Sequence, residues 1–326
     1  MTSLSVLRVL DLSEGVAGAY CTKLLAGFGA DVIKIERPGG GDPVRRHGPF
    51  PDDLPHGEKG ALFLYLNTGK KSITLDIAQR SGALLLLRLV EGAEVVVESF
   101  PPGWLTELGL GYGSLARIKP RLVMTSVTPF GQDGPYAGYR ATNLTAFAAG
   151  GQMVVTGEPD REPLKNGGYQ AEYQAGLHAF AATAVAAFSA DATEVGQHID
   201  IAAVECMATA LEPYVSSWAH QRRDIGADRS ADPRPQRRGD VEPAPAGLTV
   251  QDLLEAPQLR ARGFFQEIDH PAAGRQTYPG PPFRPEAMPW QAARAPLLGE
   301  HNEEVYCEEL ELSRKELVIL RASGVI

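Results

Sequence analysis

The stretch VLDLSEGVAGAYCTKLLAGFGADVIKIE, residues 9–36, decides the fold of this 326-residue chain. Val9–Ser13 is a short apolar run typical of a buried strand, and Ala17–Ala30 is apolar at helical spacing. Asp31–Glu36 is a second short strand, after which a proline and the glycines Gly39–Gly41 stop the pattern. This order predicts the opening βαβ unit of a doubly wound α/β fold, with a ligand crevice at the carboxyl ends of its strands.

The turn after the first strand lacks the dinucleotide fingerprint. Ser13–Gly18 reads SEGVAG, which does not give G-x-G-x-x-G, and Gly27–Gly29 lies at the wrong end of the helix. A nicotinamide enzyme is therefore disfavoured, whereas an adenine nucleotide remains possible.

The same alternation continues downstream. Apolar strand patterns at 72–76, 94–98 and 121–126 and a leucine-rich helix at 81–90 predict further strands of a parallel sheet. Asp42–Gly60 is a long polar loop, of the kind that is usually functional, and we expect it to fold over a ligand.

A single carboxylate stands at the mouth of a later helix. Gly167–Gly176 reads GGYQAEYQAG, and Glu172 falls in the first helical turn, where free N–H groups and the helix dipole favour an anion. A glutamate there is usually only a dipole partner, so its position alone does not make it catalytic. The apolar residues at helical spacing after it predict the face that this helix buries: Leu177, Phe180, Ala181, Ala184, Val185 and Phe188.

Short motifs follow one another along the chain, at Val9–Ser13, Val32–Pro38, Gly41–Arg45, Leu66–Ile73, Val97–Gly103, Ser126–Gly131, Gly196–Asp200 and Leu298–Asn302. Each is weak alone, but in this order the chain resembles the class III CoA-transferases (CaiB/BaiF type). That family includes formyl-CoA and carnitine CoA-transferases and the related alpha-methylacyl-CoA racemases. The resemblance implies a Rossmann-like large domain that binds CoA.

In the family a carboxylate stands where Glu172 stands. The resemblance implies that it attacks an acyl-CoA thioester, forms a covalent acyl-enzyme anhydride, and lets CoA pass to a carboxylic acid. Backbone N–H groups of Gly167 and Gly168 would hold the oxyanion, beside Tyr169 and Gln170. The usual residue is Asp, and one more methylene moves the carboxylate by ~1.5 Å, so we expect a pocket built around the longer side chain.

Coenzyme A would be bound as a substrate, with no permanently bound cofactor and no metal. The resemblance implies that the residues matching the family's CoA contacts are Val16, Ala17, Arg37, Asn67, Lys70, Lys71, Ser99 and Phe100. Without the family, Lys70 and Lys71 would read as a solvated pair before a strand. Trp104–Glu107 departs from the family, because many relatives carry an arginine there and this chain offers Glu107.

A racemase is the first alternative. The racemases place a histidine where this chain has Thr142, and threonine is not a general base at neutral pH without activation. His178 and His198 are more simply interpreted as structural or surface residues.

The chain divides into three predicted parts. Residues 1–220 form the CoA-binding domain with the catalytic carboxylate, 221–247 an Arg/Asp/Pro-rich linker that replaces most of the family's small domain, and 248–326 a segment that returns to the large domain with helices. The family closes its acyl site with the small domain and a partner in an interlocked homodimer. Three hypotheses remain: an active transferase on a reduced scaffold, a second subunit that supplies the missing wall, or a CoA-binding protein without turnover.

Composition agrees with a cytoplasmic enzyme. The chain is 44% hydrophobic and carries a net charge of −9, which disfavours nucleic acid as a partner. Its three cysteines match no metal-binding spacing. No signal peptide is recognisable and no run approaches 18 apolar residues, so we expect no membrane segment.

Overall fold

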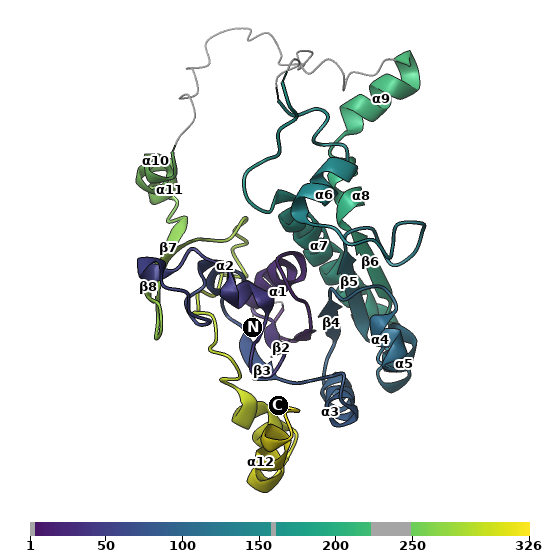
Figure 1. Ribbon diagram of the computed structural model, residues 1–326, viewed down its shortest axis with the longest axis vertical. Helices are drawn as coiled ribbons and strands as arrows, with labels where there is room; N and C mark the ends of the chain where they lie inside the picture. Colours follow the sequence, from purple (N-terminus) through teal and green to yellow (C-terminus); the bar gives the residue numbers. More distant parts are fainter. Residues whose placement is uncertain (1–3, 158–160, 223–248) are drawn as a thin grey trace.

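The computed structural model describes residues 4–157, 161–222 and 249–326. Its centre is a parallel six-stranded sheet in the order β3-β2-β1-β4-β5-β6, with helices on both faces (Figure 1). The strands are β1 (Arg8–Asp11), β2 (Asp31–Glu36), β3 (Lys71–Thr74), β4 (Val95–Glu98), β5 (Val123–Thr128) and β6 (His198–Ala202). This is the strand order of a doubly wound Rossmann-like sheet, so the predicted α/β fold is confirmed.

A hydrophobic core lies on each face of the sheet. Consecutive residues of a strand contribute to opposite cores, because side chains alternate between the two faces. Val9 packs with α1 and α7 on one face, whereas Leu10 packs with α3 and the C-terminal helices on the other. The first face carries α1 (Ala17–Gly27), α6 (Asn143–Ala149), α7 (Gln170–Thr193) and α8 (Ala203–Thr209). The second face carries α3 (Arg80–Glu91), α4 (Trp104–Glu107), α5 (Tyr112–Ile118), the π-helical η4 (Glu304–Glu309) and α12 (Arg314–Ala322).

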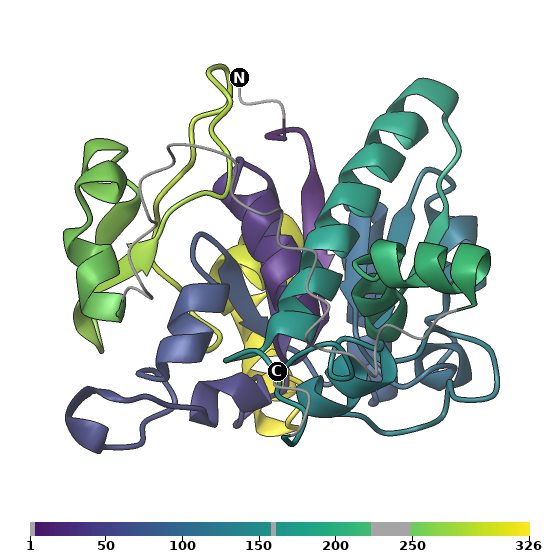
Figure 2. The ribbon, with the colours of Figure 1, turned by 90° about the horizontal axis from the view of Figure 1, so that it is seen from above.

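The buried face of α7 differs from the one that the sequence predicted, except at Phe180, which packs against the core beside Phe28. Val185 is 70% exposed and Phe188 is 78% exposed, while the buried positions are small: Ala171, Ala175, Gly176, Ala179, Thr183, Ala186, Ala187 and Ala190. α1 and α7 lie side by side (Figure 2). At Gly176 a Cβ atom would stand 2.5 Å from the Ala17 carbonyl oxygen. Close packing against α1 therefore selects small residues, and Leu177, Val185 and Phe188 face outward.

The loop at 42–60 is held down rather than free. It contains η1 (Pro43–Arg46) and η2 (Pro51–Asp53), and α2 (Ala61–Leu66) follows it. The buried Arg45 donates both Nε and Nη2 to Glu36 at 2.7 Å and pairs with Glu58 at 2.6 Å. A guanidinium bound on two sides fixes the start of the loop to the sheet, and the folding of the loop over a ligand stays a prediction.

The C-terminal segment returns to the large domain. After α9 (Glu212–Gln221), the description resumes with α10 (Val250–Glu255), α11 (Pro257–Ala261) and the hairpin of β7 (Phe265–His270) and β8 (Gly274–Pro279). Phe283 stacks on Phe28 of the loop after α1, with ring centroids 4.5 Å apart. The predicted linker, residues 221–247, lies outside the described residues from residue 223 on.

The open edge of β3 is covered by the LGEHN motif near the end of the chain. Thr74 N–H donates to Asn302 Oδ1 at 2.9 Å, and Asn302 Nδ2 donates to Thr74 Oγ1 at 2.8 Å. His301 N–H donates to the Ser72 carbonyl at 2.9 Å. This motif therefore satisfies the edge strand's main-chain groups. No described helix is long and apolar enough to cross a membrane.

Candidate functional site

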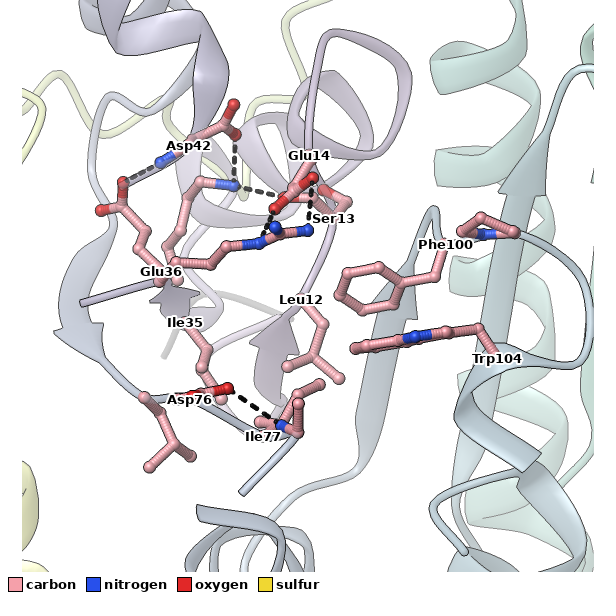
Figure 3. Close-up of a pocket in the computed structure, with 15 residues that line it drawn as sticks. Leu12, Ser13, Glu14, Ile35, Glu36, Asp42, Asp76, Ile77, Phe100 and Trp104 are labelled. Carbon is pink, nitrogen blue, oxygen red and sulfur yellow. Dashed lines mark hydrogen bonds and ion pairs between the residues drawn. The ribbon is translucent and has the colours of Figure 1, made fainter. Parts of the chain in front are cut away.

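Two cavities adjoin at the carboxyl ends of the central strands, and Glu14 lines both. The larger has a volume of about 330 Å³ and lies over the ends of β1, β2, β3 and β4 (Figure 3). The smaller has a volume of about 190 Å³ and contains Glu172. This edge of a doubly wound sheet is where ligands bind, so the two cavities form one candidate site.

One wall of the larger cavity is aromatic. The Phe100 and Trp104 rings lie beside each other, with centroids 4.5 Å apart, and Leu12 and Ile77 face them across the cavity (Figure 3). Glu98 accepts a hydrogen bond from the Phe100 N–H at 2.7 Å and fixes the turn. A flat aromatic ring system fits between such walls.

The larger cavity offers one exposed cation. Arg37, whose side chain is 67% exposed, pairs with Glu14 at 2.8 Å. The other basic residue in the lining is Lys34, which is buried and bound to Asp42 at 3.0 Å and to the Ser13 carbonyl at 2.7 Å. Arg37 is therefore the lining group that can meet a phosphate.

The smaller cavity is built from small and apolar side chains around Glu172. Its lining comes from the loop after β1, the ends of β4 and β5, and the starts of α6, α7 and α8: Glu14, Val16, Ala17, Ser99, Val127, Thr128, Pro129, Ala141, Thr142, Asn143, Ala146, Glu172 and Ala203. Ser99 Oγ accepts from the Glu14 N–H at 2.8 Å and donates to its carbonyl at 3.0 Å. This pair of bonds holds the loop that separates the two cavities.

Glu172 is a partly buried carboxylate. Burial raises the pKa of the Glu172 carboxyl above its ordinary value, and a hydrogen bond from the Val16 N–H opposes that rise. Desolvation makes the carboxylate a stronger nucleophile than one in water, while the Val16 N–H orients it. The predicted position in the first turn of α7 is confirmed.

Asn143 of α6 caps the amino end of α7. Its Oδ1 accepts from the Ala171 N–H at 3.0 Å and from the Glu172 N–H at 3.4 Å, and its Nδ2 donates to the Gly168 carbonyl at 3.2 Å. α7 has no capping side chain of its own at Tyr169. A side chain from another helix therefore satisfies the free N–H groups and sets the position of Glu172.

The predicted CoA contacts fall into separate places. Arg37 and Phe100 line the larger cavity, whereas Val16, Ala17 and Ser99 line the smaller one beside Glu172. Val16 and Ala17 were expected to meet the nucleotide. Both line the cavity that contains Glu172.

Asn67 and Lys70 belong to the core, which conflicts with the prediction that they contact CoA. The Lys70 ammonium donates to Asp11 and the Ala19 carbonyl at 2.9 Å and to Asn67 at 2.8 Å, so all three of its donors are used. Burial lowers the pKa of Lys70 to about 8, although the Asp11 carboxylate opposes this. The network supports the start of α1 from below.

Lys71 lies at the opposite edge of the sheet from both cavities. It is the first residue of β3 and pairs with Asp31, the first residue of β2, at 3.3 Å and with Glu304 at 2.9 Å. Because the strands are parallel, these amino ends are remote from the carboxyl ends where the cavities lie. Lys71 is therefore not placed to contact a ligand there.

The glycine approach to α7 is exposed. Gly167, Gly168 and Gln170 are exposed, and none of them lines the smaller cavity. Gly168 has a φ of 69° and its carbonyl is bound by Asn143, so its peptide is oriented by the cap. Tyr169 packs with Tyr20, Tyr65 and Tyr173 beside the site.

Of the positions considered for a racemase, Thr142 lies beside Glu172, whereas His178 and His198 do not. Thr142 lines the smaller cavity and caps α6, since its Oγ1 accepts from the Thr145 N–H at 3.4 Å. His178 is exposed on α7 and bonds to the Gln174 carbonyl at 2.9 Å. His198 bonds to Ser126 Oγ at 2.8 Å and stacks on Tyr112. Neither histidine lines either cavity.

Three site residues were missed from the sequence. Glu14 follows the first strand directly, and that position at the crevice could have drawn attention to it. Trp104 was noted only as part of Trp104–Glu107, the segment in which many relatives carry an arginine and this chain does not. The sequence around Asn143 does not indicate its capping role, because its partner Ala171 is 28 residues away in the chain. Among the described residues, no group of three or more His, Cys, Asp or Glu could hold a metal ion.

Comparison with known proteins agrees over most of the chain. The model of CoA-transferase family III matches residues 4–241 and 237–302. The chain is 32% identical over 382 residues to the succinyl-CoA:(R)-benzylsuccinate CoA-transferase subunit BbsE of Thauera aromatica, covering 92% of this chain and 93% of that protein. It is 28% identical to the formyl-CoA:oxalate CoA-transferase of Streptomyces coelicolor, covering 99% of each.

A solved structure has the same architecture. The crystal structure of a CAIB/BAIF family protein from Brucella suis matches with a TM-score of 0.81 at 30% identity, covering 94% of this chain and 99% of that one. The alignment with the Thauera protein is longer than this 326-residue chain, so that relative contains residues without a counterpart here.

Proposed function

This chain belongs to CoA-transferase family III and is a transferase of acyl-CoA thioesters, and from that premise we propose that Glu172 is its covalent nucleophile. The observation that carries the proposal is the place of Glu172: a partly buried carboxylate, held by the Val16 N–H, in a cavity that adjoins a larger one at Glu14. Glu14, the other acidic residue of that cavity, is paired with Arg37.

The reaction divides into balanced exchanges. A Glu172 oxygen attacks the thioester carbonyl carbon, the C–S bond breaks, and CoA leaves as thiolate from an acyl-glutamyl anhydride. The thiolate then attacks the Glu172 carbonyl carbon, which releases the first acid and leaves a glutamyl-CoA thioester. An acceptor carboxylate repeats the two steps in reverse, and the new acyl-CoA leaves with Glu172 restored.

CoA would span both cavities. The adenine ring fits between the Phe100–Trp104 wall and the apolar residues opposite, with Arg37 beside the phosphates. The thioester end would pass Glu14 and Ser99 to reach Glu172. Donors for the oxyanion would come from the start of α1, where Val16 already donates to the carboxylate, rather than from Gly167 and Gly168.

The active unit is proposed to be a homodimer. Leu177, Val185 and Phe188 form an exposed apolar face on α7, with exposures of 43%, 70% and 78%. Exposed large apolar side chains on one helix favour contact with another protein, and a second copy would also supply a wall over the shortened chain. Light scattering gives the mass directly, and a monomer that is fully active would contradict the homodimer.

A trapping experiment tests the nucleophile. The protein is incubated with a panel of acyl-CoA thioesters, treated with hydroxylamine, and the peptide that contains Glu172 is mapped by mass spectrometry. A hydroxamate on Glu172 is expected, and it should be absent from Glu172→Gln. Glu14→Gln is the matched control, because it removes the neighbouring carboxylate and leaves Glu172. Transfer activity that persists in Glu172→Gln would contradict the proposal.

A further inference from the structure

We infer that the acyl group handled at Glu172 is short and uncharged. The inference rests on the proposed function, which places the thioester carbonyl against the Glu172 carboxylate. The acyl chain attached to that carbonyl then starts against the walls of the smaller cavity, which this chain supplies.

Those walls are apolar where the chain would extend. Val127 and Pro129 come from the end of β5, Ala146 from α6 and Ala203 from the start of α8. The uncharged polar side chains of the lining each bind a main-chain group: Ser99, Thr128, Thr142 and Asn143. An alkyl chain is stabilised by such a surface, whereas a distal polar group would find few free partners.

The charged residues of the cavity lining are Glu14 and Glu172, and none of the lining residues is Lys, Arg or His. Arg37 of the larger cavity pairs with Glu14 at 2.8 Å, so the charge of Glu14 is balanced and Glu172 carries the negative charge that an acyl group would meet. A distal carboxylate about 5 Å from Glu172, at an effective dielectric constant of about 20, would bind on the order of 100-fold more weakly. Solvent at the mouth of the cavity reduces this penalty. We therefore expect a compound with a distal carboxylate to bind at least about tenfold more weakly than an uncharged one.

Two cations near the mouth do not change this charge balance. The Lys165 ammonium donates to the carbonyls of Asn166 at 2.9 Å and Gly168 at 3.3 Å. Arg140 precedes the lining residue Ala141, but it is exposed and is not itself part of the lining. Arg140 at the rim is the cation that could reach a distal carboxylate in the cavity. The experiment below therefore includes the variant Arg140→Gln.

The size of the cavity sets the length of the acyl group. Its volume of about 190 Å³ is below the ~300 Å³ at which pockets for drug-sized ligands begin. An unbranched chain of a few carbons fits beside the thioester. This separates the chain from relatives such as the succinyl-CoA:mesaconate CoA-transferase of Haloarcula hispanica, whose name gives a dicarboxylic acyl group.

Unreactive thioethers of CoA test the inference without turnover. Dissociation constants of S-butyl-CoA, S-(3-carbamoylpropyl)-CoA and S-(3-carboxypropyl)-CoA are measured by calorimetry on the wild-type protein. The carbamoyl and carboxyl compounds match in size and differ in charge. We expect the carboxyl compound to bind at least about tenfold more weakly than the carbamoyl compound, and the difference to shrink in Glu14→Gln.

Equal or tighter binding of the carboxyl compound overturns the inference. If that tight binding is lost in Arg140→Gln, the rim arginine recognises the distal carboxylate and the acyl group is dicarboxylic. If no thioether binds, the inference and the proposed CoA site fail together. If the thioethers bind with the expected order but no hydroxamate forms on Glu172, the proposed chemistry fails and the acyl preference stands.

Discussion

Asn143→Ala tests whether a side chain from α6 sets the position of the nucleophile. The change removes three hydrogen bonds, two of them to N–H groups in the first turn of α7. Ala171 is fully buried, so its N–H is left without a partner. Loss of a cap costs about 0.5–2 kcal/mol, and an unsatisfied buried donor costs about 1–3 kcal/mol. We expect the free energy of unfolding to fall by ~1–2 kcal/mol.

The effect on catalysis is expected to be larger than the loss of stability. The first turn of α7 carries the Glu172 carboxylate, and a displacement of about 1 Å can cost roughly 100-fold in rate. We expect kcat to fall about 10- to 100-fold, while KM for the acyl-CoA changes less than about threefold, because Asn143 does not line the larger cavity.

Asn143→Asp separates positioning from folding. Aspartate keeps an oxygen that can accept from Ala171 and loses the donor to Gly168. Its negative charge beside Glu172 raises the pKa of Glu172 further, so the acid limb of the pH–rate profile should move to higher pH. Thr145→Ala, on the exposed side of α6, is the control. Wild-type kcat and an unchanged profile in folded Asn143→Ala would refute the reasoning.

Four further changes have defined outcomes. Gly176→Ala places a Cβ 2.5 Å from a main-chain carbonyl of α1. The overpacking cost of about 1–3 kcal/mol should lower both the melting temperature and kcat. Gly113→Ala is the control, because the space around Gly113 is open and neither quantity should fall. Burial raises the pKa of Glu172, so its ionised form costs stability above that pKa; Glu172→Gln should melt higher than wild type at pH 7 and lose this advantage near pH 4. Burial lowers the pKa of Lys23 to about 7, so wild-type stability should rise between pH 7 and 10.5, and melting curves of Lys23→Met should lack that rise. Arg37→Gln should weaken CoA binding by calorimetry only about two- to fivefold, as for an exposed ion pair, and the difference should vanish at high salt; a loss beyond about 30-fold would contradict that.

The sheet could be predicted because its strands are continuous apolar runs. β2 has the bounds that the sequence predicted, Asp31–Glu36, since a run rich in β-branched residues and flanked by turn residues has few alternatives. The position of Glu172 in a first turn was equally local. Both follow from residues next to one another in the chain.

The predictions that were wrong concern the direction in which side chains point. Lys70 and Lys71 are neighbours in sequence, yet one enters a buried network and the other joins ion pairs at the amino edge of the sheet. α7 buries alanines because α1 comes close, and a pattern of hydrophobicity ranks leucine and phenylalanine above alanine. These contacts depend on how segments that are distant in sequence pack together, and the residue pattern of one segment does not contain that information.

The covered edge of β3 also has a consequence for synthesis. Asn302 is 228 residues from its partner Thr74, and at a translation rate of about 5–20 residues per second it emerges roughly 10–50 seconds later. During that interval the main-chain groups of β3 on its outer side have no partner from this chain. A nascent chain is therefore vulnerable to strand pairing with other polypeptides at this edge, and ribosome-associated chaperones should matter more for its yield than for its final stability.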